Sequence, residues 1–233
     1  MSDAPLPVGI LGGMGPEATI LLQQRVMAAV PASDDSDHVP LIIDMNPQVP
    51  SRIAHLIEGT GEDPSPVLAA MAKRLEAAGA QALAMPCNTA HHYATAVTGA
   101  VDIPFLSMLD LAAARALRDV GRGGGVGMLA SPAVRMTGLF ETVLGAHEIS
   151  VLWPEDGDAM LAAIRAIKAE GPVPSARETV AAASAELLAA GAQMQFIACS
   201  EFSLIADSVA VDARAVDTVD LLARAIVEFS AGP

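Results

Sequence analysis

The feature that most constrains how this 233-residue chain can fold is a stretch that occurs twice. Residues 69–87 and 181–199 align without a gap, and both contain the run Ala-Ala-Gly-Ala-Gln, at 77–81 and at 189–193. The chain has two cysteines, and both fall at the last position of this stretch, 112 residues apart. Self-similarity at a fixed offset is the signature of repeated structural units. The repeat therefore predicts two similar halves, each with one cysteine at the same place.

Each copy of the repeat encodes a helix, a tight turn and a buried strand. In the first copy, apolar residues recur at helical spacing up to Ala78, and Gly79 can take the left-handed conformation that ends a helix. The apolar run 82–85 follows and is bounded by Pro86, which predicts a short buried strand. Cys87 comes directly after it. Ligands of parallel sheets bind at the carboxyl ends of strands, so Cys87 and Cys199 are candidate functional groups.

A second feature also recurs, in the same order. Val8-Gly9-Ile10-Leu11 is echoed by Val126-Gly127-Met128-Leu129, and each predicts a strand. We therefore expect an α/β protein made of two pseudo-symmetric parallel-sheet domains that face a central cleft. The expected domains are 1–112 with 207–233, and 113–206; the amphipathic helix at 217–229 is expected to return to the first. The glycine-rich segment 121–125 is the best candidate for a linker.

The first strand is followed by a glycine-rich loop, residues 12–15, and then by a helix that begins at Pro16. Ile20, Leu21, Met27 and Val30 are expected to form the buried face of this helix. The pattern Gly13-x-Gly15-x-x-Ala18 matches the dinucleotide-binding fingerprint, a weak signal by itself. Asp44 ends the next strand about 30 residues after the glycines, whereas a ribose-binding acid is expected after about 20.

Charge and composition exclude several classes of partner. The chain has 13 basic and 27 acidic residues, a formal net charge of −14, which argues against nucleic acid or an anionic membrane as a partner. No apolar run approaches the ~20 residues of a membrane span. The first residues have neither the basic nor the apolar region of a signal peptide, so we expect a cytoplasmic, thiol-reducing location.

Two cysteines that face a common cleft suit a particular reaction. To remove a proton from one face of a carbon and return one to the other, an enzyme needs two acid/base groups, one of which starts deprotonated. The segment after Cys87, residues 88–93, is expected to open a helix, whose positive end lowers the pKa of a neighbouring thiol toward neutrality. His91 or His92 could assist, although a histidine in a first helical turn is more often an incidental surface residue.

Neither a pyridoxal cofactor nor a metal is expected. A pyridoxal enzyme needs a Schiff-base lysine, and of the two lysines Lys73 is expected on an exposed helix face, which leaves Lys168. No cluster of His, Cys, Asp and Glu has the spacing of metal ligands. We therefore expect cofactor-free chemistry. In the loop 46–52, at the carboxyl end of a strand, Arg52 is a candidate to bind a carboxylate.

Three motifs in order, Gly12–Thr19, Met85–His91 and Cys199-Ser200-Glu201, together resemble the aspartate/glutamate racemase superfamily, closest to its aspartate racemase branch. The resemblance implies two pseudo-symmetric α/β domains, catalysis without pyridoxal phosphate, and a homodimer. It also implies Cys87 and Cys199 as the opposing bases, Arg52 as the contact of the side-chain carboxylate and Lys168 as a second basic contact. The other implied substrate-binding residues are Gly13, Met14, Asn88, Thr89, Ser131 and Ser200.

Two segments depart from the family pattern. The usual Gly-Cys-Thr-Glu becomes Ala198-Cys199-Ser200-Glu201, which keeps a hydroxyl donor. Ala130-Ser131-Pro132 stands where the family has a hydroxyl- and glycine-rich loop, of which Ser131 remains. These changes bear on the choice of substrate more than on the type of reaction.

The sequence thus predicts a cofactor-independent amino-acid racemase that acts on a small dicarboxylate, aspartate or alternatively glutamate. A maleate isomerase or a malonate-type decarboxylase on the same scaffold is the main alternative. Those relatives often use one cysteine, so two cysteines count against them. A nicotinamide-dependent dehydrogenase depends on the glycine pattern alone. A non-catalytic role, with both cysteines as small buried apolar residues, leaves their equivalent positions unexplained.

Overall fold

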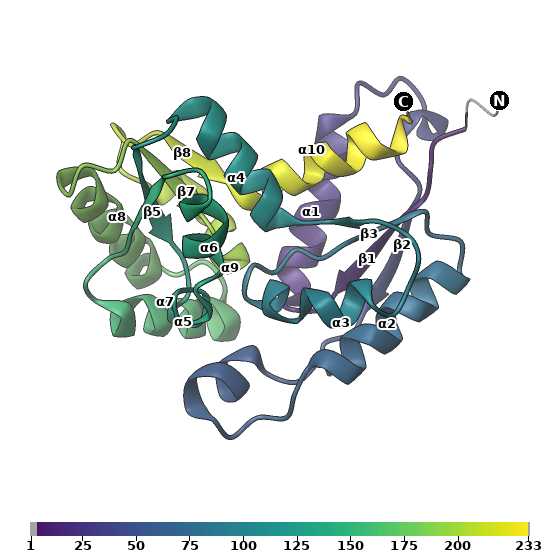
Figure 1. Ribbon diagram of the computed structural model, residues 1–233, viewed down its shortest axis with the longest axis horizontal. Coiled ribbons are helices and arrows are strands. Elements are labelled where there is room, and N and C mark those ends of the chain that lie inside the picture. The colour runs from purple at the N-terminus through teal and green to yellow at the C-terminus, as the bar shows by residue number, and fades with distance from the viewer. Residues whose placement is uncertain (1–3, 233) are drawn as a thin grey trace. The chain divides into compact units, whose positions relative to one another are not determined.

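The structure is a computed structural model that describes residues 4–232 (Figure 1). The chain divides into two compact units. The second is continuous, Leu109–Thr218, whereas the first combines the residues up to Met108 with those from Val219 onward. The terminal helix thus belongs to the first unit. The expected domain boundaries, 1–112 with 207–233 and 113–206, stay predictions. Within the described residues, no helix combines the length and the apolar character needed to cross a bilayer.

In the described part of the first unit, four strands form a parallel sheet in the order β2-β1-β3-β4. Its elements are β1 Val8–Gly12, α1 Pro16–Ala29, β2 Leu41–Met45, α2 Ser65–Ala77, β3 Ala82–Ala84, α3 Ala94–Thr98, β4 Phe105–Leu106 and α10 Thr218–Ser230, with short helical turns at Asp35–Asp37, Ala54–Glu58 and Thr89–Tyr93.

The second unit repeats this plan with a four-stranded parallel sheet in the order β6-β5-β7-β8, again within the described residues. Its elements are α4 Met108–Asp119, β5 Gly125–Leu129, α5 Pro132–Thr137, α6 Leu139–Gly145, β6 Ser150–Leu152, α7 Gly157–Glu170, α8 Pro174–Ala189, β7 Met194–Ile197, α9 Ser200–Ser203 and β8 Ala215–Asp217, with a 3₁₀ turn at Ala206–Ser208.

The strand order fixes where the helices lie. Parallel strands are joined by right-handed crossovers, and the connection from β1 to β2 runs in the opposite direction to the one from β2 to β3. The helices of these two connections therefore cover opposite faces of the sheet. Figure 1 shows this arrangement, with α2 and α3 on one side of the strands and α1 on the other. The predicted class, two pseudo-symmetric α/β units with parallel sheets, is confirmed.

The sequence repeat is also a structural repeat, and its shared residues have a packing role. Gly9 on β1 has no side chain, and a Cβ there would stand 2.9 Å from Ala80 Cβ and 3.1 Å from Leu75 Cβ. On β5, a Cβ at Gly127 would similarly stand 3.1–3.2 Å from Leu187 Cβ and Ala192 Cβ. In both units a strand glycine thus lets the repeat helix approach the sheet closely. The repeated sequence therefore preserves one helix-on-sheet contact.

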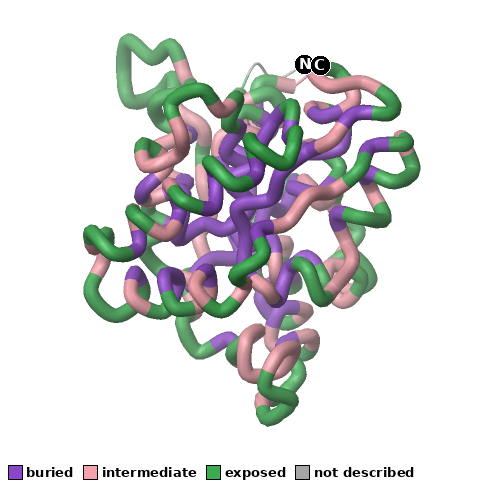
Figure 2. The backbone as a smooth tube through the Cα atoms, turned by 90° about the vertical axis from the view of Figure 1, so that its left-hand side faces the viewer, coloured by how far each residue is buried: buried purple, intermediate pink, exposed green. Residues whose placement is uncertain are grey.

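Buried residues follow the central strands and the inward faces of the helices (Figure 2). Each unit has its own apolar cluster, and each cluster includes the cysteine of that unit. In the second unit, Phe140 and Phe196 are fully buried and their rings lie 6.4 Å apart. Each thiol is thus packed against the apolar core of its own unit.

The buried face of α1 differs from the expected one. Ala18, Leu22 and Val26, spaced by four residues, are buried together with Thr19. Ile20 and Met27, expected in the core, are 49% and 56% exposed, and Leu21 and Val30 are only partly buried. The prediction for Ile20 and Met27 was wrong because apolar residues surround this helix, so the sequence alone does not select one face.

The glycine-rich segment 121–125 lies inside the second unit and is not a linker. Gly123 N donates to Glu148 O at 2.9 Å, so the segment is tied to the approach to β6. A Cβ at Gly124 would stand 2.1 Å from Val120 Cγ1 and 2.5 Å from Gln193 Oε1. Gly124 therefore serves close packing just before β5, and the linker prediction was wrong.

A buried polar pair distinguishes the second core from the first and leads to a stability prediction. Ser184 Oγ donates to Gln195 Oε1 at 2.6 Å, Gln195 Nε2 donates to Ser184 O at 2.8 Å, and Ala210 N donates to Ser184 Oγ at 3.1 Å. Ser184→Ala removes the partner of the buried Gln195 Oε1 and of the partly buried Ala210 N–H, so we expect a loss of about 2 kcal/mol in the free energy of unfolding, measured by urea denaturation.

The first unit supplies the matched control for this experiment. The equivalent positions, 112 residues earlier, are occupied by Ala72 and Leu83, both fully buried. The double variant Ser184→Ala with Gln195→Leu introduces this apolar pair, and we expect it to recover part of the loss because Gln195 no longer leaves a buried carbonyl unsatisfied. A double variant less stable than Ser184→Ala would contradict this account.

Candidate active site

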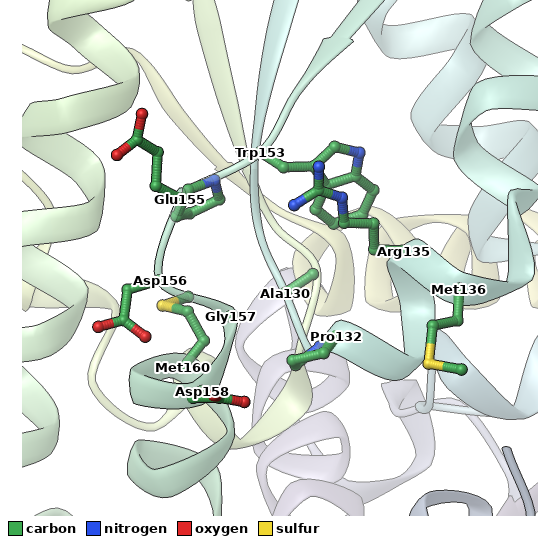
Figure 3. A pocket seen from close by; sticks show the side chains of 11 residues that line it. Ala130, Pro132, Arg135, Met136, Trp153, Glu155, Asp156, Gly157, Asp158 and Met160 are labelled. Carbon is green, nitrogen blue, oxygen red and sulfur yellow. The ribbon is translucent and has the colours of Figure 1, made fainter. Parts of the chain in front are cut away.

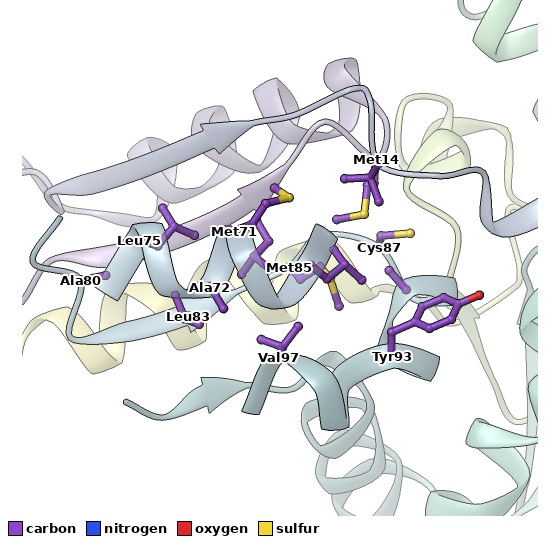
Figure 4. Close-up of a cluster of buried hydrophobic side chains, with 14 residues drawn as sticks. Met14, Met71, Ala72, Leu75, Ala80, Leu83, Met85, Cys87, Tyr93 and Val97 are labelled. Carbon is purple, nitrogen blue, oxygen red and sulfur yellow. The ribbon is translucent and has the colours of Figure 1, made fainter. Parts of the chain in front are cut away.

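Three adjacent strand ends gather the predicted site residues of the first unit. Met14 follows β1, Arg52 follows β2 and Cys87 follows β3, and these strands are neighbours in the order β2-β1-β3. Because the strands are parallel, their carboxyl ends meet at one edge of the sheet. Met14 and Cys87 belong to the same buried cluster, and Figure 4 shows them at one end of it.

The glycine loop after β1 packs tightly on its own chain. Gly13 has a φ of +88°, and a Cβ there would stand 2.3 Å from the carbonyl carbon of Asn46. Its N–H donates to Thr19 Oγ1 at 3.0 Å, which ties the loop to the first turn of α1. Met14 is buried, with 3% of its surface exposed. The loop glycine therefore has a packing reason within the protein, independent of any dinucleotide.

The backbone of Cys87 is held by its neighbours. Ala90 N donates to Cys87 O at 3.1 Å, and His91 Nδ1 lies 2.9 Å from the same oxygen. Met108 N donates to His91 Nε2 at 3.0 Å, so the ring proton is on Nδ1 and is donated to Cys87 O. We had expected His91 to be an incidental surface residue. It is instead buried, with 3% of its surface exposed. It fixes the strand end through the backbone.

The segment after Cys87 is shorter than the predicted helix. Asn88 is the N-cap of a 3₁₀ turn, Thr89–Tyr93, and α3 begins only at Ala94. Asn88 is buried with 2% of its surface exposed, and Thr89, the first residue of the turn, is partly buried. Both predicted donors thus lie directly beside the thiol in the chain, on a turn too short to carry a long helix dipole.

Arg52 is anchored at the same edge by its own loop. Its Nη1 donates to Pro50 O at 2.9 Å and to Val49 O at 3.3 Å, while its buried Nε has no hydrogen-bond partner among the described residues. Nearby, Tyr93 OH and His55 Nδ1 are 2.7 Å apart. Burial, together with the nearby Asp63 and Cys87, raises the pKa of Tyr93 to about 12, while Arg52 opposes the rise. Arg52, Tyr93 and Cys87 therefore share one electrostatic environment.

In the second unit, Cys199 lies in a hydrogen-bonded chain of charged groups. Its Sγ donates to Glu201 Oε2 at 3.1 Å, and the other carboxylate oxygen, Oε1, forms an ion pair with Lys168 Nζ. Cys199 follows β7 and caps the four-residue helix α9, which starts with Ser200, while Lys168 is near the end of α7. The Glu201 side chain is 10% exposed and that of Lys168 38%.

Burial and charge set the protonation of this group. Burial raises the pKa of the Cys199 thiol well above its usual value, and the negative charge of Glu201 raises it further. Burial alone would raise the pKa of Glu201 too, but the Lys168 ammonium and the hydrogen bonds outweigh it and hold that pKa below its usual value. At neutral pH the structure therefore holds a protonated thiol against an ionised carboxylate.

The predicted hydroxyl residues of the second unit are both buried. Ser131 follows β5, and its Oγ accepts a hydrogen bond from Ala133 N at 3.2 Å, which caps α5. Ser200 Oγ lies 3.5 Å from Glu201 Oε2. Ser131 thus caps α5 through Ala133 N. Ser200 is instead directed at the Glu201 carboxylate, which also accepts a hydrogen bond from the thiol.

A cavity of about 350 Å³ opens beside the strand ends of β5 and β6 (Figure 3). Arg135 lies over the ring of Trp153, with its guanidinium carbon 5.9 Å from the ring centroid, and Trp153 Nε1 donates to Glu141 Oε1 at 2.8 Å. The opposite wall carries the start of α7, including Asp156 and Asp158. None of the ten predicted site residues lines this cavity.

Glu201 is the residue that sequence reasoning quoted in a motif but did not assign to the site. The available signal was a difference between the two copies, because the position equivalent to Glu201 in the first copy is Thr89. A carboxylate beside one thiol and a hydroxyl residue beside the other mark an asymmetry. Within the described residues, no group of three or more His, Cys, Asp and Glu side chains could hold a metal ion.

Comparisons with known proteins agree with this architecture. A sequence model of the Asp/Glu/Hydantoin racemase family matches residues 11–226. An aspartate racemase from Picrophilus torridus superposes with a TM-score of 0.85 at 29% identity, over 97% of this chain and 94% of that one. An aspartate racemase homologue from Pyrococcus horikoshii OT3 gives 0.72 at 22% identity, over 97% and 99%. A glutamate racemase isoform from Bacillus anthracis gives 0.69 at 14%, over 98% and 82%.

Proposed function

Since this chain belongs to the Asp/Glu/Hydantoin racemase family, and is therefore an isomerase of the racemase class, we propose that it interconverts L- and D-aspartate by two-base proton transfer at Cα, without a cofactor. One observation carries the proposal: the only two cysteines of the chain lie at equivalent strand ends of two similar units, after β3 and after β7. A two-base reaction needs such a pair of acid/base groups.

The reaction proposed is a symmetrical one. One thiolate takes the Cα proton, the electron pair of the C–H bond stays on Cα, and the other thiol gives its proton to the opposite face. The product is the other enantiomer, and the two sulfur atoms have exchanged their protonation states. The carbanion is the difficult species, because an amino acid's Cα–H is a far weaker acid than a thiol, so donors must be positioned around it. We propose Asn88, Thr89 and Ser200 as these donors, next to the cysteines in the chain.

The substrate assignment rests on the basic residues. In a chain of net charge −14, a dicarboxylate needs a local positive site. We propose that Arg52 binds the side-chain carboxylate, because its loop already orients the guanidinium through Val49 O and Pro50 O. Lys168 is proposed as the second basic contact and Gly13, Met14 and Ser131 as further substrate contacts. Similarity to an aspartate racemase at 29% identity also favours aspartate.

The proposed function is tested with L-aspartate and D-aspartate, incubated separately with the purified protein in D₂O without added cofactor. Loss of the Cα proton signal in NMR, together with appearance of the other enantiomer in chiral analysis, is the expected result. Glutamate and a 5-substituted hydantoin are run in parallel, because the family includes these substrate classes. Exchange with glutamate or hydantoin alone would overturn the substrate assignment. Absence of exchange with all three would overturn the proposed activity, and maleate and a malonate derivative would then be tested.

The assembly is a separate proposal. We expect a homodimer, as the resemblance to the family implies, and sedimentation equilibrium checks it. A monomer at the concentrations used in the activity assay would contradict this expectation.

A further inference from the structure

We propose that Glu201, held by Lys168, is a positioning residue that keeps Cys199 protonated in the resting enzyme, so that Cys199 starts the reaction as the acid and Cys87 as the base. This inference rests on the proposed function, and it assigns unequal starting roles to two cysteines that the sequence repeat makes equivalent. The contacts that carry it lie within the second unit.

The first step of the inference is the geometry around the thiol. Glu201 uses its two oxygens for two partners: Oε2 accepts from Cys199 Sγ at 3.1 Å, and Oε1 pairs with Lys168 Nζ. A carboxylate that accepts a hydrogen bond from a thiol favours the protonated form of that thiol, because the thiolate would face a like charge and lose the bond. The ion pair keeps the carboxylate ionised although it is buried, so it stays an acceptor.

The second step is the difference between the two units. The residue two positions after the cysteine is Glu201 in the second unit and Thr89 in the first, although the two stretches align without a gap. Thr89 has a hydroxyl group, which carries no charge and does not penalise a thiolate. A two-thiol reaction needs one thiolate and one thiol at the start. Because Cys199 holds the proton in this proposal, Cys87 is the thiolate.

The third step considers the other groups that pack around Cys199. The cluster that contains it is apolar, with Leu129, Ile164, Ile167 and Phe202 among its members. Among the titratable groups of the elements packed against it, Glu201 on α9 contacts the thiol, Lys168 on α7 pairs with Glu201, and Asp217 lies on β8. Asp217 Oδ1 accepts from Ser203 Oγ at 2.8 Å and is thus directed at Ser203. Glu201 and Lys168 are the charges that act on the thiol.

The proton balance of a turnover follows from this arrangement. The Cα proton passes to the Cys87 thiolate, and the Cys199 S–H proton passes to Cα, which leaves Cys87 as a thiol and Cys199 as a thiolate. Beside Glu201 this thiolate is unfavourable. The starting state is restored when Cys199 takes a proton from water and Cys87 returns one, or when the opposite enantiomer is processed.

The chain offers a direct test because it has two cysteines and one tyrosine. In the variant Cys87→Ser, Cys199 is the only thiol, and its thiolate is titrated by absorbance at 240 nm. The pKa of Tyr93, raised to about 12, keeps tyrosinate absorbance out of this range. We expect Glu201→Gln in this background to move the midpoint to lower pH and to raise the thiolate fraction at pH 8 about tenfold, the effect of one pH unit.

Two further variants separate charge from packing. Lys168→Met removes the ammonium but leaves the carboxylate, so we expect the midpoint to move to higher pH, opposite to Glu201→Gln. Asp207→Asn is the matched control, because this exposed carboxylate of the same unit pairs with Arg177 and does not contact Cys199 in the described hydrogen bonds. We expect it to leave the midpoint unchanged. A midpoint that Glu201→Gln leaves unchanged or raises, or shifts of the same sign in both site variants, would overturn the proposal.

A kinetic readout uses the enzyme with both cysteines. Loss of the Cys199 proton sets the high-pH limb of kcat/KM for aspartate racemisation in this scheme. Glu201→Gln is expected to move that limb to lower pH, which a purely structural role would not do. If aspartate is not racemised but the thiol titrates as expected, the proposed function fails. The proposed effect of Glu201 on the protonation of Cys199 is then still supported. Racemisation with an unaltered titration overturns the present inference alone.

Discussion

Replacement of either cysteine by alanine is expected to abolish racemisation, with a loss of at least about 10³-fold in kcat. A positioned acid or base contributes about 10²–10⁴-fold, and the two-base reaction fails without either partner. Alanine removes only a sulfur atom from a small buried side chain, so we expect the fold to persist. Chiral chromatography of L- and D-aspartate incubations measures the loss, and thermal melting checks the fold.

Exchange with solvent distinguishes the two variants. Cys199→Ala keeps the base on one face, so it is expected to exchange the Cα proton of one enantiomer in D₂O without forming the other. Cys87→Ala is expected to show the complementary preference or no exchange. Serine variants at both positions serve as isosteric comparisons, because a hydroxyl group is too weak an acid to replace a thiol. A folded alanine variant that retains a tenth of the racemase rate would contradict the two-cysteine proposal.

The second large effect is expected at Arg52. Arg52→Ala is predicted to lower kcat/KM for aspartate by about 10²-fold, which corresponds to about 3 kcal/mol, because the side-chain carboxylate loses a charge-assisted partner. The rate of Cα exchange of alanine, which has no such carboxylate, is expected to change little. The measurement is therefore the ratio of the two rates, obtained by NMR in D₂O on the same protein samples.

Arg74→Ala is the matched control for Arg52→Ala. Arg74 is a cation of the same unit whose Nη2 lies 2.6 Å from Asp44 Oδ2, and its side chain is 56% exposed. Its loss lowers the charge of the chain by the same amount, so it tests general electrostatic attraction of the substrate. We expect the aspartate-to-alanine ratio to be unaltered. An equal loss on both substrates in Arg52→Ala would exclude the proposed carboxylate contact.

The repeat made much of the fold predictable. The apolar runs at 8–11 and 82–85 have the length of buried parallel strands. The repeats of these runs later in the chain predicted the second sheet. Gly79 and Gly191 were readable as helix ends, and both have a positive φ, +102° and +89°. Local signals sufficed here because strand length, turn chemistry and hydrophobic pattern agree in both copies.

Tertiary context decided the elements that were predicted wrongly. The residues of α1 are apolar on more than one face, and only packing selects Leu22 and Val26 over Ile20 and Met27. His91 was expected at the surface because its local position resembles a first helical turn. Its burial depends on Met108, 17 residues later, which donates to the ring. A short window of sequence does not predict contacts between residues that are far apart in the chain.

The sequence indicated which candidate site residues lie at strand ends, but it did not indicate which of them contact one another. The sequence indicated Cys87, Cys199 and Arg52 at strand ends, and the structure has each of them directly after, or in the loop after, the expected strand. Their roles stay predictions. The pairing of Lys168 with Glu201 was not predicted, because 33 residues separate them and the family resemblance had assigned the lysine to the substrate.

The discontinuous first unit has a consequence for biosynthesis. Residues 109–218 form a continuous unit, whereas α10, the last helix of the first unit, follows them in the chain. A ribosome makes protein from the N-terminus at about 5–20 residues per second, so the last residue of the second unit is added before the rest of α10 is translated. During that interval the first sheet lacks the helix whose Asp220 pairs with Arg25 of α1. Synthesis of the second unit is therefore complete before synthesis of the first.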